Sequence, residues 1–395
     1  MERNKYILYI ATIAKKHICQ FHIPYLNWFQ EQGYIVHVCA GDDFEDGDAH
    51  EMPYCDAFYP VEFSRSPLSP QNLKAYKQLK AIIDAHDYEL IHCHTPVAAV
   101  IGRIAAKQTR KDRHTTVLYT THGFHFFHGA PKSGKLYYLA EKLMIPYTDG
   151  LITINREDYE AAKRMCQGKN CDVYYVHGMG VDTNRIRNMP VNAAELKHRL
   201  GIPQEAFVLL SVSELNANKN LKTTLSAFAK LKHPDVYYLI CGTGDMLDSY
   251  RQLAEELGIS DRVIFPGYRY DIFEIVHIAD VFLFPSLREG LGVAPIEAMS
   301  ASVPIIASDI RGVREYAVDG ENSILLDPND VDGFAGAIDR LYNNRELLEH
   351  LGVHALEAVK PFDLANSLRA MEQIYCKYLG IEVKEVKTEE TAVTV

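Results

Sequence analysis

The sequence predicts an α/β protein made of two doubly wound domains, and two observations carry this prediction. Short apolar runs alternate along the chain with longer amphipathic segments, which is the pattern of parallel strands joined by helices on both faces of a sheet. The chain has 395 residues, and a domain takes roughly 100–200 residues. In open sheets of this kind ligands bind beyond the carboxyl ends of the strands, so the loops after the strands are the candidate functional segments.

Composition and charge exclude several classes of protein. The net charge of −11 argues against a nucleic-acid partner. The eight cysteines form no CxxC pair, which indicates reduced thiols rather than a disulfide framework. No apolar run approaches the roughly 18–20 residues that span a bilayer, and the N-terminus reads as a strand rather than a signal sequence. We therefore expect a cytoplasmic protein that is soluble or peripheral to a membrane.

Charge is distributed unevenly between the two halves of the chain. Residues 1–185 hold 21 Lys and Arg against 21 Asp and Glu, together with 12 of the 17 histidines, and the remainder carries the whole excess of −11. The N-terminal half is thus the better candidate for an anionic surface or a phosphate-bearing acceptor.

The first strand is predicted over Tyr6–Ile10, and the loop after it, Ala11–Gln20, contains His17 and lies just before His22. Both histidines are candidates for contacts to an acceptor, although we favour the alternative that each is an ordinary hydrogen-bonded loop histidine. Further strands and helices of this half are predicted over Tyr25–Gln32, Ile35–Cys39, Leu73–Ala85, Leu90–His94, Val97–Lys107, Val117–Thr121, Gly150–Asn155, Arg156–Met165 and Val173–His177.

Two histidine-containing segments lie at strand ends in this half. His92-Cys93-His94 invites a zinc interpretation but lacks further ligands at metal-site spacing, and we expect no metal there. The other segment contains His122, His125 and Phe126 and begins the stretch 124–138, which is rich in aromatic and basic residues. That stretch suits a membrane interface; core and loop packing is the alternative, which we favour slightly less.

In the second half, three predicted strands are followed by polar loops. The loop after Phe207–Val212 contains Lys219, the loop after Tyr237–Cys241 contains Gly242, and the segment after Val263–Phe265 contains Tyr268 and Arg269. A glycine between a buried strand and a helix allows a nucleotide to approach the backbone closely. Ordinary strand–helix turns would give the same pattern.

Residues 280–309 form the segment around which the chain is organised. The predicted strand Val281–Phe284 is followed by a loop with Glu289, and then by a helix in which Pro295 suits the first turn. Glu297 is expected in that same turn. Amide groups at a helix start attract a diphosphate, and the two carboxylates could bind hydroxyls at opposite ends of a nucleotide sugar. Alternatively, Glu297 only complements the helix dipole and Glu289 is a solvated loop residue.

This segment resembles the signature of retaining glycosyltransferase family 4 through its two glutamates eight positions apart, its glycines, its proline and its Glu-Ala-Met string. The resemblance implies the GT-B fold: two Rossmann-like domains that face each other across a cleft, with a C-terminal helix crossing back to the first. It implies an acceptor-side domain at 1–188 with the crossing helix 362–379, a nucleotide-sugar domain at 189–361, and a loose tail at 381–395.

The resemblance also implies roles for the matching residues. Glu289 and His122 would be catalytic, and Glu297 would bind the ribose. The donor side would include Lys219, Gly290, Leu291, Gly292, Val293, Gly242, Arg269 and Tyr268, and the acceptor side His17, His125 and Phe126. Among the departures from the family pattern, Glu214 matters most: it stands where a phosphate-binding arginine is usual, and it would repel a phosphate unless it turns away or is paired.

The strings around His122 and Lys219 most resemble enzymes of capsular polysaccharide and exopolysaccharide assembly. This implies a UDP-sugar donor, a saccharide acceptor linked to a polyprenyl diphosphate at the inner membrane face, and no metal or other cofactor. One alternative is a transferase that makes a soluble glycoside, and the stretch 124–138 is the feature that discriminates. A second is a non-catalytic nucleotide-sugar-binding partner, which the residue at 214 would favour.

Overall fold

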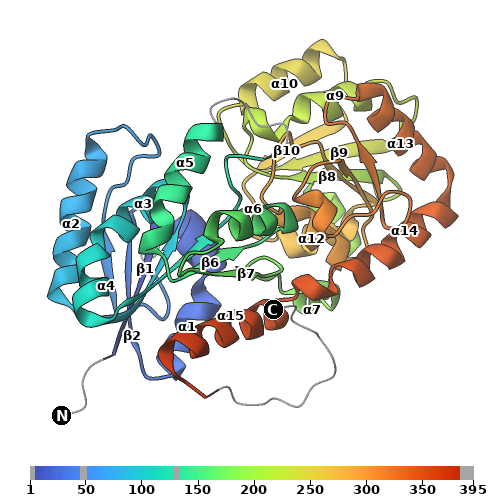
Figure 1. Ribbon diagram of the computed structural model, residues 1–395. Helices are drawn as coiled ribbons and strands as arrows, with labels where there is room; N and C mark the ends of the chain where they lie inside the picture. The colour runs from blue at the N-terminus through green and yellow to red at the C-terminus, as the bar shows by residue number, and fades with distance from the viewer. Residues whose placement is uncertain (1–4, 45–50, 128–133, 383–395) are drawn as a thin grey trace. The chain divides into compact units, whose positions relative to one another are not determined.

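The computed structural model describes residues 5–44, 51–127 and 134–382, and it divides into two compact units (Figure 1). Unit 1 comprises Met1–Gly180 and Ala365–Val395, and unit 2 comprises Val181–Leu364. The predicted tail 381–395 lies almost wholly outside the described residues. Within the described ranges, every helix is too short or too polar to cross a membrane.

Unit 1 is built on a seven-stranded parallel sheet in the order β3-β2-β1-β4-β5-β6-β7. Its strands are β1 (Tyr6–Ile13), β2 (Ile35–Gly41), β3 (Ala57–Pro60), β4 (Tyr88–His94), β5 (Thr116–Thr121), β6 (Gly150–Thr153) and β7 (Asp172–Tyr175). Its helices are η1 (Ala14–Cys19), α1 (Ile23–Glu31), α2 (Gln71–Ala85), α3 (Pro96–Ala105), α4 (Lys107–Arg113), α5 (Gly134–Met144), η2 (Ile145–Tyr147), α6 (Arg156–Cys166) and, in its larger part, α15 (Leu364–Leu379).

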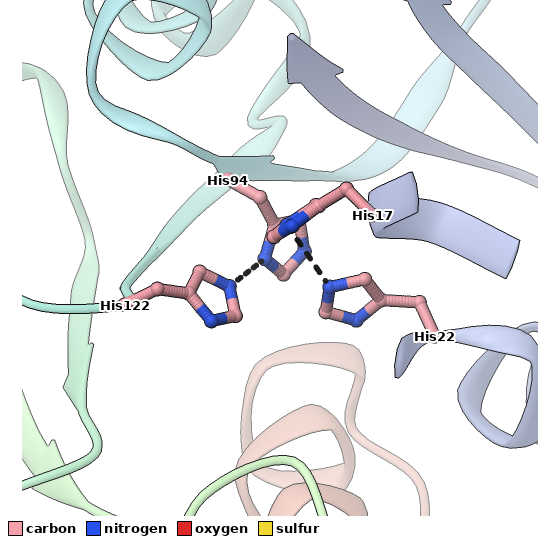
Figure 2. A group of neighbouring side chains, drawn as sticks. All are labelled: His17, His22, His94 and His122. Carbon is pink, nitrogen blue, oxygen red and sulfur yellow. Dashed lines mark hydrogen bonds between the residues drawn. The ribbon is translucent and has the colours of Figure 1, made fainter. Parts of the chain in front are cut away.

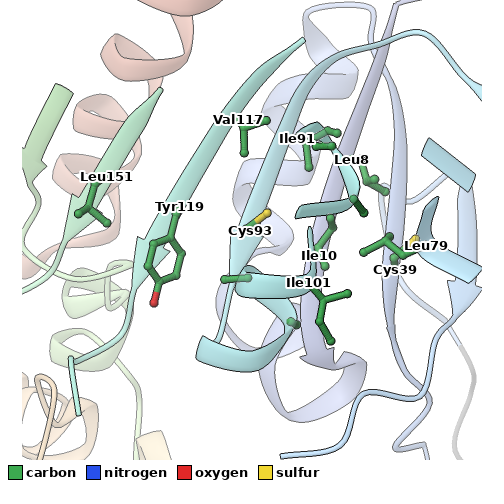
Figure 3. Close-up of a cluster of buried hydrophobic side chains, with 14 of the residues drawn as sticks. Leu8, Ile10, Cys39, Leu79, Ile91, Cys93, Ile101, Val117, Tyr119 and Leu151 are labelled. Carbon is green, nitrogen blue, oxygen red and sulfur yellow. The ribbon is translucent and has the colours of Figure 1, made fainter. Parts of the chain in front are cut away.

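The two faces of this sheet carry different side chains, because successive residues of a strand point to opposite sides. Leu8, Ile10 and Cys93 point into the apolar core that α2 and α3 cover (Figure 3). Tyr9 and His92 lie on the opposite face, where the Tyr375 hydroxyl of α15 is 2.7 Å from Tyr9 Oη and 2.9 Å from His92 Nδ1. These hydrogen bonds attach α15 to β1 and β4.

Unit 2 repeats the architecture with a six-stranded parallel sheet in the order β10-β9-β8-β11-β12-β13. Its strands are β8 (Phe207–Val212), β9 (Val236–Cys241), β10 (Val263–Gly267), β11 (Val281–Phe284), β12 (Ile305–Ser308) and β13 (Ser323–Leu326). Its helices are α7 (Thr183–Arg187), α8 (Ala193–Arg199), η3 (Ala217–Lys219), α9 (Leu221–Phe228), α10 (Leu247–Glu256), α11 (Ile272–Ile275), η4 (Val276–Ile278), α12 (Val293–Ser300), η5 (Val313–Glu315), α13 (Val331–Asn343), α14 (Arg345–Ala358) and η6 (Lys360–Phe362).

Each sheet has one place where the strand order reverses direction. In unit 1 this place lies between β1 and β4, and in unit 2 between β8 and β11. The connections from the two central strands leave toward opposite sides there, so the loops at their carboxyl ends diverge and leave a crevice. Both candidate sites described below are built on these strand pairs.

The structure corrects three local expectations. The helix α12 begins at Val293, two residues earlier than Pro295 would require as its first residue, so Glu297 lies in the second turn, not the first. The predicted loop over Ala11–Gln20 contains the π-helix η1 instead. The predicted aromatic loop 124–138 ends in the helix α5; its residues 128–133 lie outside the described part of the chain.

Candidate functional site

Two loops of unit 2 meet at the reversal of its sheet. One follows β8 and the other follows β11, and they are joined by hydrogen bonds from Leu287 N to Asn218 O at 2.8 Å and from Asn218 Nδ2 to Arg288 O at 2.9 Å. Lys219 Nζ lies 2.6 Å from Glu289 Oε1. A lysine and a glutamate that are predicted separately thus form one ion pair.

The Lys219–Glu289 pair is well sheltered. The two side chains are 20% and 14% exposed, and the ammonium lies 5.3 Å from the centre of the Phe284 ring. The backbone before the lysine is fixed by Asn216, whose side-chain oxygen accepts hydrogen bonds from the amides of Asn218 and Lys219. Solvent screens the attraction between these two charges less than it does in a fully exposed pair.

The loop from Gly290 to Val293 passes directly from this pair into α12. Gly292 is the N-cap with φ +83°, a conformation that favours glycine, and the Tyr316 hydroxyl donates to its carbonyl at 3.1 Å. Gly312 also packs closely against this loop, because a Cβ on Gly312 would lie 2.9 Å from Leu291 N. Tyr316 and Gly312 both hold this loop in place, although neither was predicted as a site residue from the sequence.

Glu297 is carried by α12 and is partly buried. Burial raises the pKa of its carboxyl to about 7, because removing the carboxylate from water disfavours its charged form. Its protonation therefore changes near neutral pH.

Glu214 is exposed, and its carboxylate accepts a hydrogen bond from Asn216 Nδ2 at 3.0 Å. The amide is neutral and does not cancel the charge of the carboxylate. Repulsion between Glu214 and a phosphate therefore stays a prediction.

The residues predicted to contact the nucleotide after β9 and β10 are Gly242, Tyr268 and Arg269. A Cβ on Gly242 would lie 1.9 Å from Ser213 O, so the glycine allows the loops after β8 and β9 to pack together. Arg269 makes two hydrogen bonds to Asp271, at 2.8 and 2.5 Å. Tyr268 is 61% exposed. Contact of these three residues with a nucleotide stays a prediction.

Four histidines gather at the reversal of the sheet in unit 1 (Figure 2). His17 comes from η1, His22 is the N-cap of α1, His94 ends β4, and His122 follows β5. One ring nitrogen from each lies within 4.8 Å of the others. This group is called the histidine cluster below, and its members come from segments far apart in the sequence.

The histidine cluster is shielded from solvent. His22 and His94 are fully buried, His17 is 9% exposed and His122 is partly exposed. Burial is the main cause that lowers the pKa of each ring, to about 4 for His122. All four imidazoles are therefore neutral at physiological pH.

We expected no metal at His92-Cys93-His94 because further ligands are missing nearby in the sequence. The geometry of the strand also turns Cys93 away from the two histidines. Cys93 points into the apolar core on one face, whereas both histidines lie on the other. His92 has partners for both ring nitrogens, Tyr375 and Thr120. His94 alone joins the histidine cluster, and its further ligand candidates come from other loops rather than from nearby sequence.

His125 and Phe126 do not join the cluster but lie beside α5. The His125 ring stacks on Tyr137 with centroids 4.8 Å apart, and Phe126 meets Tyr138 edge-on at 5.2 Å. The buried positions of α5 are Gly134 and Glu141, and Glu141 is held by Arg103 Nη2 at 2.9 Å and by the Tyr119 hydroxyl at 3.1 Å. The buried carboxylate of Glu141 thus attaches α5 to the rest of unit 1. By contrast, Leu136, Leu139 and Leu143 are 71%, 51% and 59% exposed.

Comparison with known proteins assigns a family to this arrangement. Residues 192–357 match the model for glycosyl transferases group 1, and residues 6–155 match the model for glycosyl transferase 4-like proteins. The chain is also 42% identical over 386 residues to EpsD of Bacillus subtilis strain 168, a protein named as a glycosyltransferase, covering 97% of this chain and 99% of that protein. The chain belongs to the GT4-type glycosyltransferases of the GT-B fold.

Two further comparisons characterise this glycosyltransferase. It is 28% identical over 298 residues to the Escherichia coli UDP-Gal:α-D-GlcNAc-diphosphoundecaprenol α-1,3-galactosyltransferase, covering 74% of this chain and 76% of that enzyme. Its fold matches that of Anabaena HepE in complex with UDP and glucose, with a TM-score of 0.76, 20% identity and coverage of 95% and 100%. The two Rossmann-like sheets and this likeness confirm the predicted GT-B α/β fold.

The structure of this glycosyltransferase brings some predicted residues together and leaves others apart. Lys219 contacts Glu289 in unit 2, and Glu289 leads through Gly290, Leu291 and Gly292 into α12, which begins at Val293 and carries Glu297. His17 and His122 meet in unit 1, with ring centroids 4.7 Å apart. The sequence could have indicated the partnership of His94 with them, because parallel strands place their carboxyl ends at one edge of a sheet.

Proposed function

We propose that this glycosyltransferase transfers a sugar, with retention of anomeric configuration, from a UDP-sugar to a hydroxyl of a saccharide carried on a polyprenyl diphosphate. The product would be an intermediate in polysaccharide biosynthesis. The observation that carries the proposal is the sheltered ion pair of Lys219 and Glu289 beside the start of α12. The names of the Bacillus and Escherichia coli relatives, and the UDP in HepE, support the substrate classes.

The charge that develops in this reaction lies on the departing diphosphate. Lys219 provides a fixed positive charge, and the amides of the loop from Gly290 to Val293 lead into the positive end of α12. Such preorganised groups stabilise a leaving group without having to reorganise during the reaction. Lys219 would release part of its interaction with Glu289 when the phosphate binds.

The two glutamates would accept hydrogen bonds from sugar hydroxyls. Glu289 would hold the transferred sugar, and the carboxylate of Glu297 would accept from the ribose hydroxyls. His122 would contact the transferred sugar near the reacting carbon. Its neutral ring can donate or accept one hydrogen bond.

We also propose that donor binding requires no divalent cation. Lys219 supplies the positive charge that a metal ion would otherwise bring to the diphosphate. Over the part of unit 2 that the structure describes, no group of histidine, cysteine and acidic side chains has the spacing of a metal site. UDP affinity should accordingly be the same before and after treatment with a chelator.

A lipid-linked acceptor requires the enzyme to work at a membrane surface, and α5 has features suited to this. Its exposed residues include the three leucines, Tyr137 and Tyr138 at 37% each, and the lysines at 135 and 142. Apolar and aromatic side chains flanked by lysines favour the interface of an anionic bilayer. We therefore place the enzyme at the inner membrane face, with α5 against the lipid.

Nucleotide release by the purified enzyme tests the proposal. A panel of UDP- and GDP-sugars is assayed with and without a membrane extract as the source of acceptor, with Glu289→Gln as the inactive control. UDP release from one sugar that rises with the extract supports the proposal, and the anomer of the product reports retention. Release with a water-soluble acceptor alone would replace the lipid-linked acceptor by a soluble one. Saturable binding without release from any donor would indicate a non-catalytic partner.

A further inference from the structure

The histidine cluster has the composition of a transition-metal site. Its four side chains converge from η1, α1 and the ends of β4 and β5 (Figure 2). Beside the cluster, Thr12 at the end of β1 and Thr95 directly after β4 are 83 positions apart in the sequence, yet their hydroxyls are hydrogen-bonded at 2.7 Å and Thr12 N donates to Thr95 Oγ1 at 2.9 Å. The convergence is therefore a property of the fold rather than of one flexible loop.

The distances within the cluster fit coordination. His17 Nε2 and His22 Nε2 are 3.4 Å apart, and His94 Nδ1 and His122 Nε2 are also 3.4 Å apart. A tetrahedral zinc ion with bonds of about 2.0–2.1 Å holds its nitrogen ligands roughly 3.3–3.4 Å from one another. Two pairs of ring nitrogens are thus already at the required separation. One ring nitrogen from each of the four residues lies within 4.8 Å of the others, so the remaining separations must shorten by at most about 1.4 Å.

Hydrogen bonding alone leaves this cluster incompletely satisfied. Each close pair of rings uses one N–H and one lone pair. In addition, His22 Nδ1 and His94 Nε2 are buried without a hydrogen-bond partner. Packing four neutral imidazoles together is therefore unfavourable by itself. A cation bound by the facing nitrogens would use the lone pairs of His22 Nε2 and His94 Nδ1, and it would leave the opposite nitrogens of these two rings as N–H groups.

We propose that His17, His22, His94 and His122 bind one zinc-class transition-metal ion. Four imidazoles without a carboxylate favour zinc, cobalt, nickel or copper over magnesium and calcium, which require oxygen ligands. Burial keeps the rings in the neutral form that coordinates metals. The proposal concerns unit 1 and is independent of donor binding in unit 2.

The metal would also define how His122 can act. Coordination through Nε2 leaves Nδ1 as the only ring nitrogen that can make a hydrogen bond. It would fix the ring orientation as well, as ligation generally does for histidine. This part of the inference rests on the role proposed above for His122, whereas metal binding itself does not.

Direct metal binding tests the proposal without any sugar donor. The exposed pair His350 and His354, with ring centroids 4.2 Å apart on α14, could bind a metal weakly and is first removed by His354→Gln. The full-length variant is stripped with a chelator and titrated with cobalt(II) chloride. We expect one cobalt ion per chain, with the intense visible absorption of tetrahedral cobalt, and its displacement by zinc.

Substitutions in the same background identify the ligands. His17→Gln, at the rim of the cluster, should weaken cobalt binding by at least about tenfold; His125→Gln, a neighbour of His122 that stacks on Tyr137 instead, should leave it unchanged. Circular dichroism checks folding, and His122→Gln replaces His17→Gln if the latter misfolds. Absence of the tetrahedral spectrum, or equal affinities in the His17 and His125 variants, would overturn the metal site.

Discussion

Lys219 Nζ and Glu289 Oε1 lie 2.6 Å apart although 70 positions separate the two residues in the sequence. They meet because β8 and β11 are neighbours in the sheet and both strands end at the same edge. The ion pair thus follows from the topology of unit 2, and its two members can be tested separately.

Replacing Lys219 with alanine should weaken binding of the UDP-sugar by roughly 10–100-fold, because a charge-assisted contact to the diphosphate is lost. Isothermal titration calorimetry measures this. Lys222→Ala is the matched control, since that lysine is exposed on the first turn of α9. Unchanged affinity in the Lys219 variant would remove the lysine from the diphosphate site.

Glu289→Gln keeps the shape of the side chain but removes its charge. We expect turnover to fall by about 10²–10³-fold with a small effect on UDP affinity, because the carboxylate would act on the transferred sugar. Steady-state rates of UDP release measure the loss. The exposed Glu321→Gln is the control, and a Glu289 variant with normal turnover would end its catalytic assignment.

Donor affinity should depend on pH through Glu297, whose carboxyl has its pKa raised to about 7 by burial. In the proposed role the ionised form would accept hydrogen bonds from both ribose hydroxyls, so affinity should fall as the pH is lowered through about 7. Titrations at about pH 6 and pH 8 measure this. In Glu297→Gln the dependence should disappear, and a variant that keeps the full dependence would contradict the assignment.

The Glu297 carboxyl should make the stability of the fold depend on pH in the direction opposite to that of donor affinity. The folded state binds the Glu297 proton more tightly than the unfolded chain does, so this contribution to stability is present below about pH 4.5 and is lost as the pH rises to about 7. Without ligand, Glu297→Gln should therefore stabilise the protein at pH 8 by on the order of 1 kcal/mol. Denaturant unfolding measures the difference, and a destabilised variant at that pH would contradict it.

Membrane contact through α5 predicts that Leu136→Glu and Leu143→Glu weaken binding to vesicles containing anionic lipids by about tenfold or more, since each leucine side chain contributes roughly 1.5–3 kcal/mol on burial. Co-sedimentation with vesicles measures binding. Thermal stability should not change, because both side chains are more than half exposed. Leu68→Glu, at a position 95% exposed in the same unit, is the control; equal losses in all three variants would exclude α5 as the contact.

Two glycines of unit 2 should respond oppositely to alanine. Gly242→Ala places a methyl group 1.9 Å from Ser213 O, and we expect it to cost at least about 2 kcal/mol of stability. Gly336→Ala in α13 meets no atom within 4 Å and should stabilise by about 0.5–1 kcal/mol through helix propensity. Urea unfolding compares the two, and similar effects would show that close packing of the loops after β8 and β9 is not required.

Much of this fold could be predicted from the sequence. The buried strands of parallel sheets are short apolar runs that end at turn residues, and β8 and β11 have the predicted bounds. The first residue of α12 was harder to predict from the sequence. Proline is tolerated anywhere in the first turn, and Gly292 caps the helix without a side-chain hydrogen bond. The short edge strand β3 and the helix α5 were missed because neither shows the apolar pattern of its class.

The sites were predictable to different degrees. Lys219 and Glu289 could each be found from their loops, but their contact depends on which strands are adjacent, and no local pattern encodes that. The histidine cluster was harder to find, since the local neighbours of His94 do not join it: Cys93 points into the apolar core, and His92 is hydrogen-bonded to Tyr375 and Thr120. Its other members come from three separate segments, and their spacing matches no known pattern. Tertiary adjacency decided both sites.

The hydroxyl of Tyr375 joins Tyr9 of β1 and His92 of β4, from which it is separated in the sequence by the whole of unit 2. A ribosome therefore completes unit 1 only when α15 has been synthesised, after unit 2. Until then, a nascent N-terminal unit exposes the face of its sheet that α15 covers. Residues 1–180 made alone should consequently behave as an aggregation-prone intermediate, and a premature stop codon just before α15 would leave unit 1 incomplete.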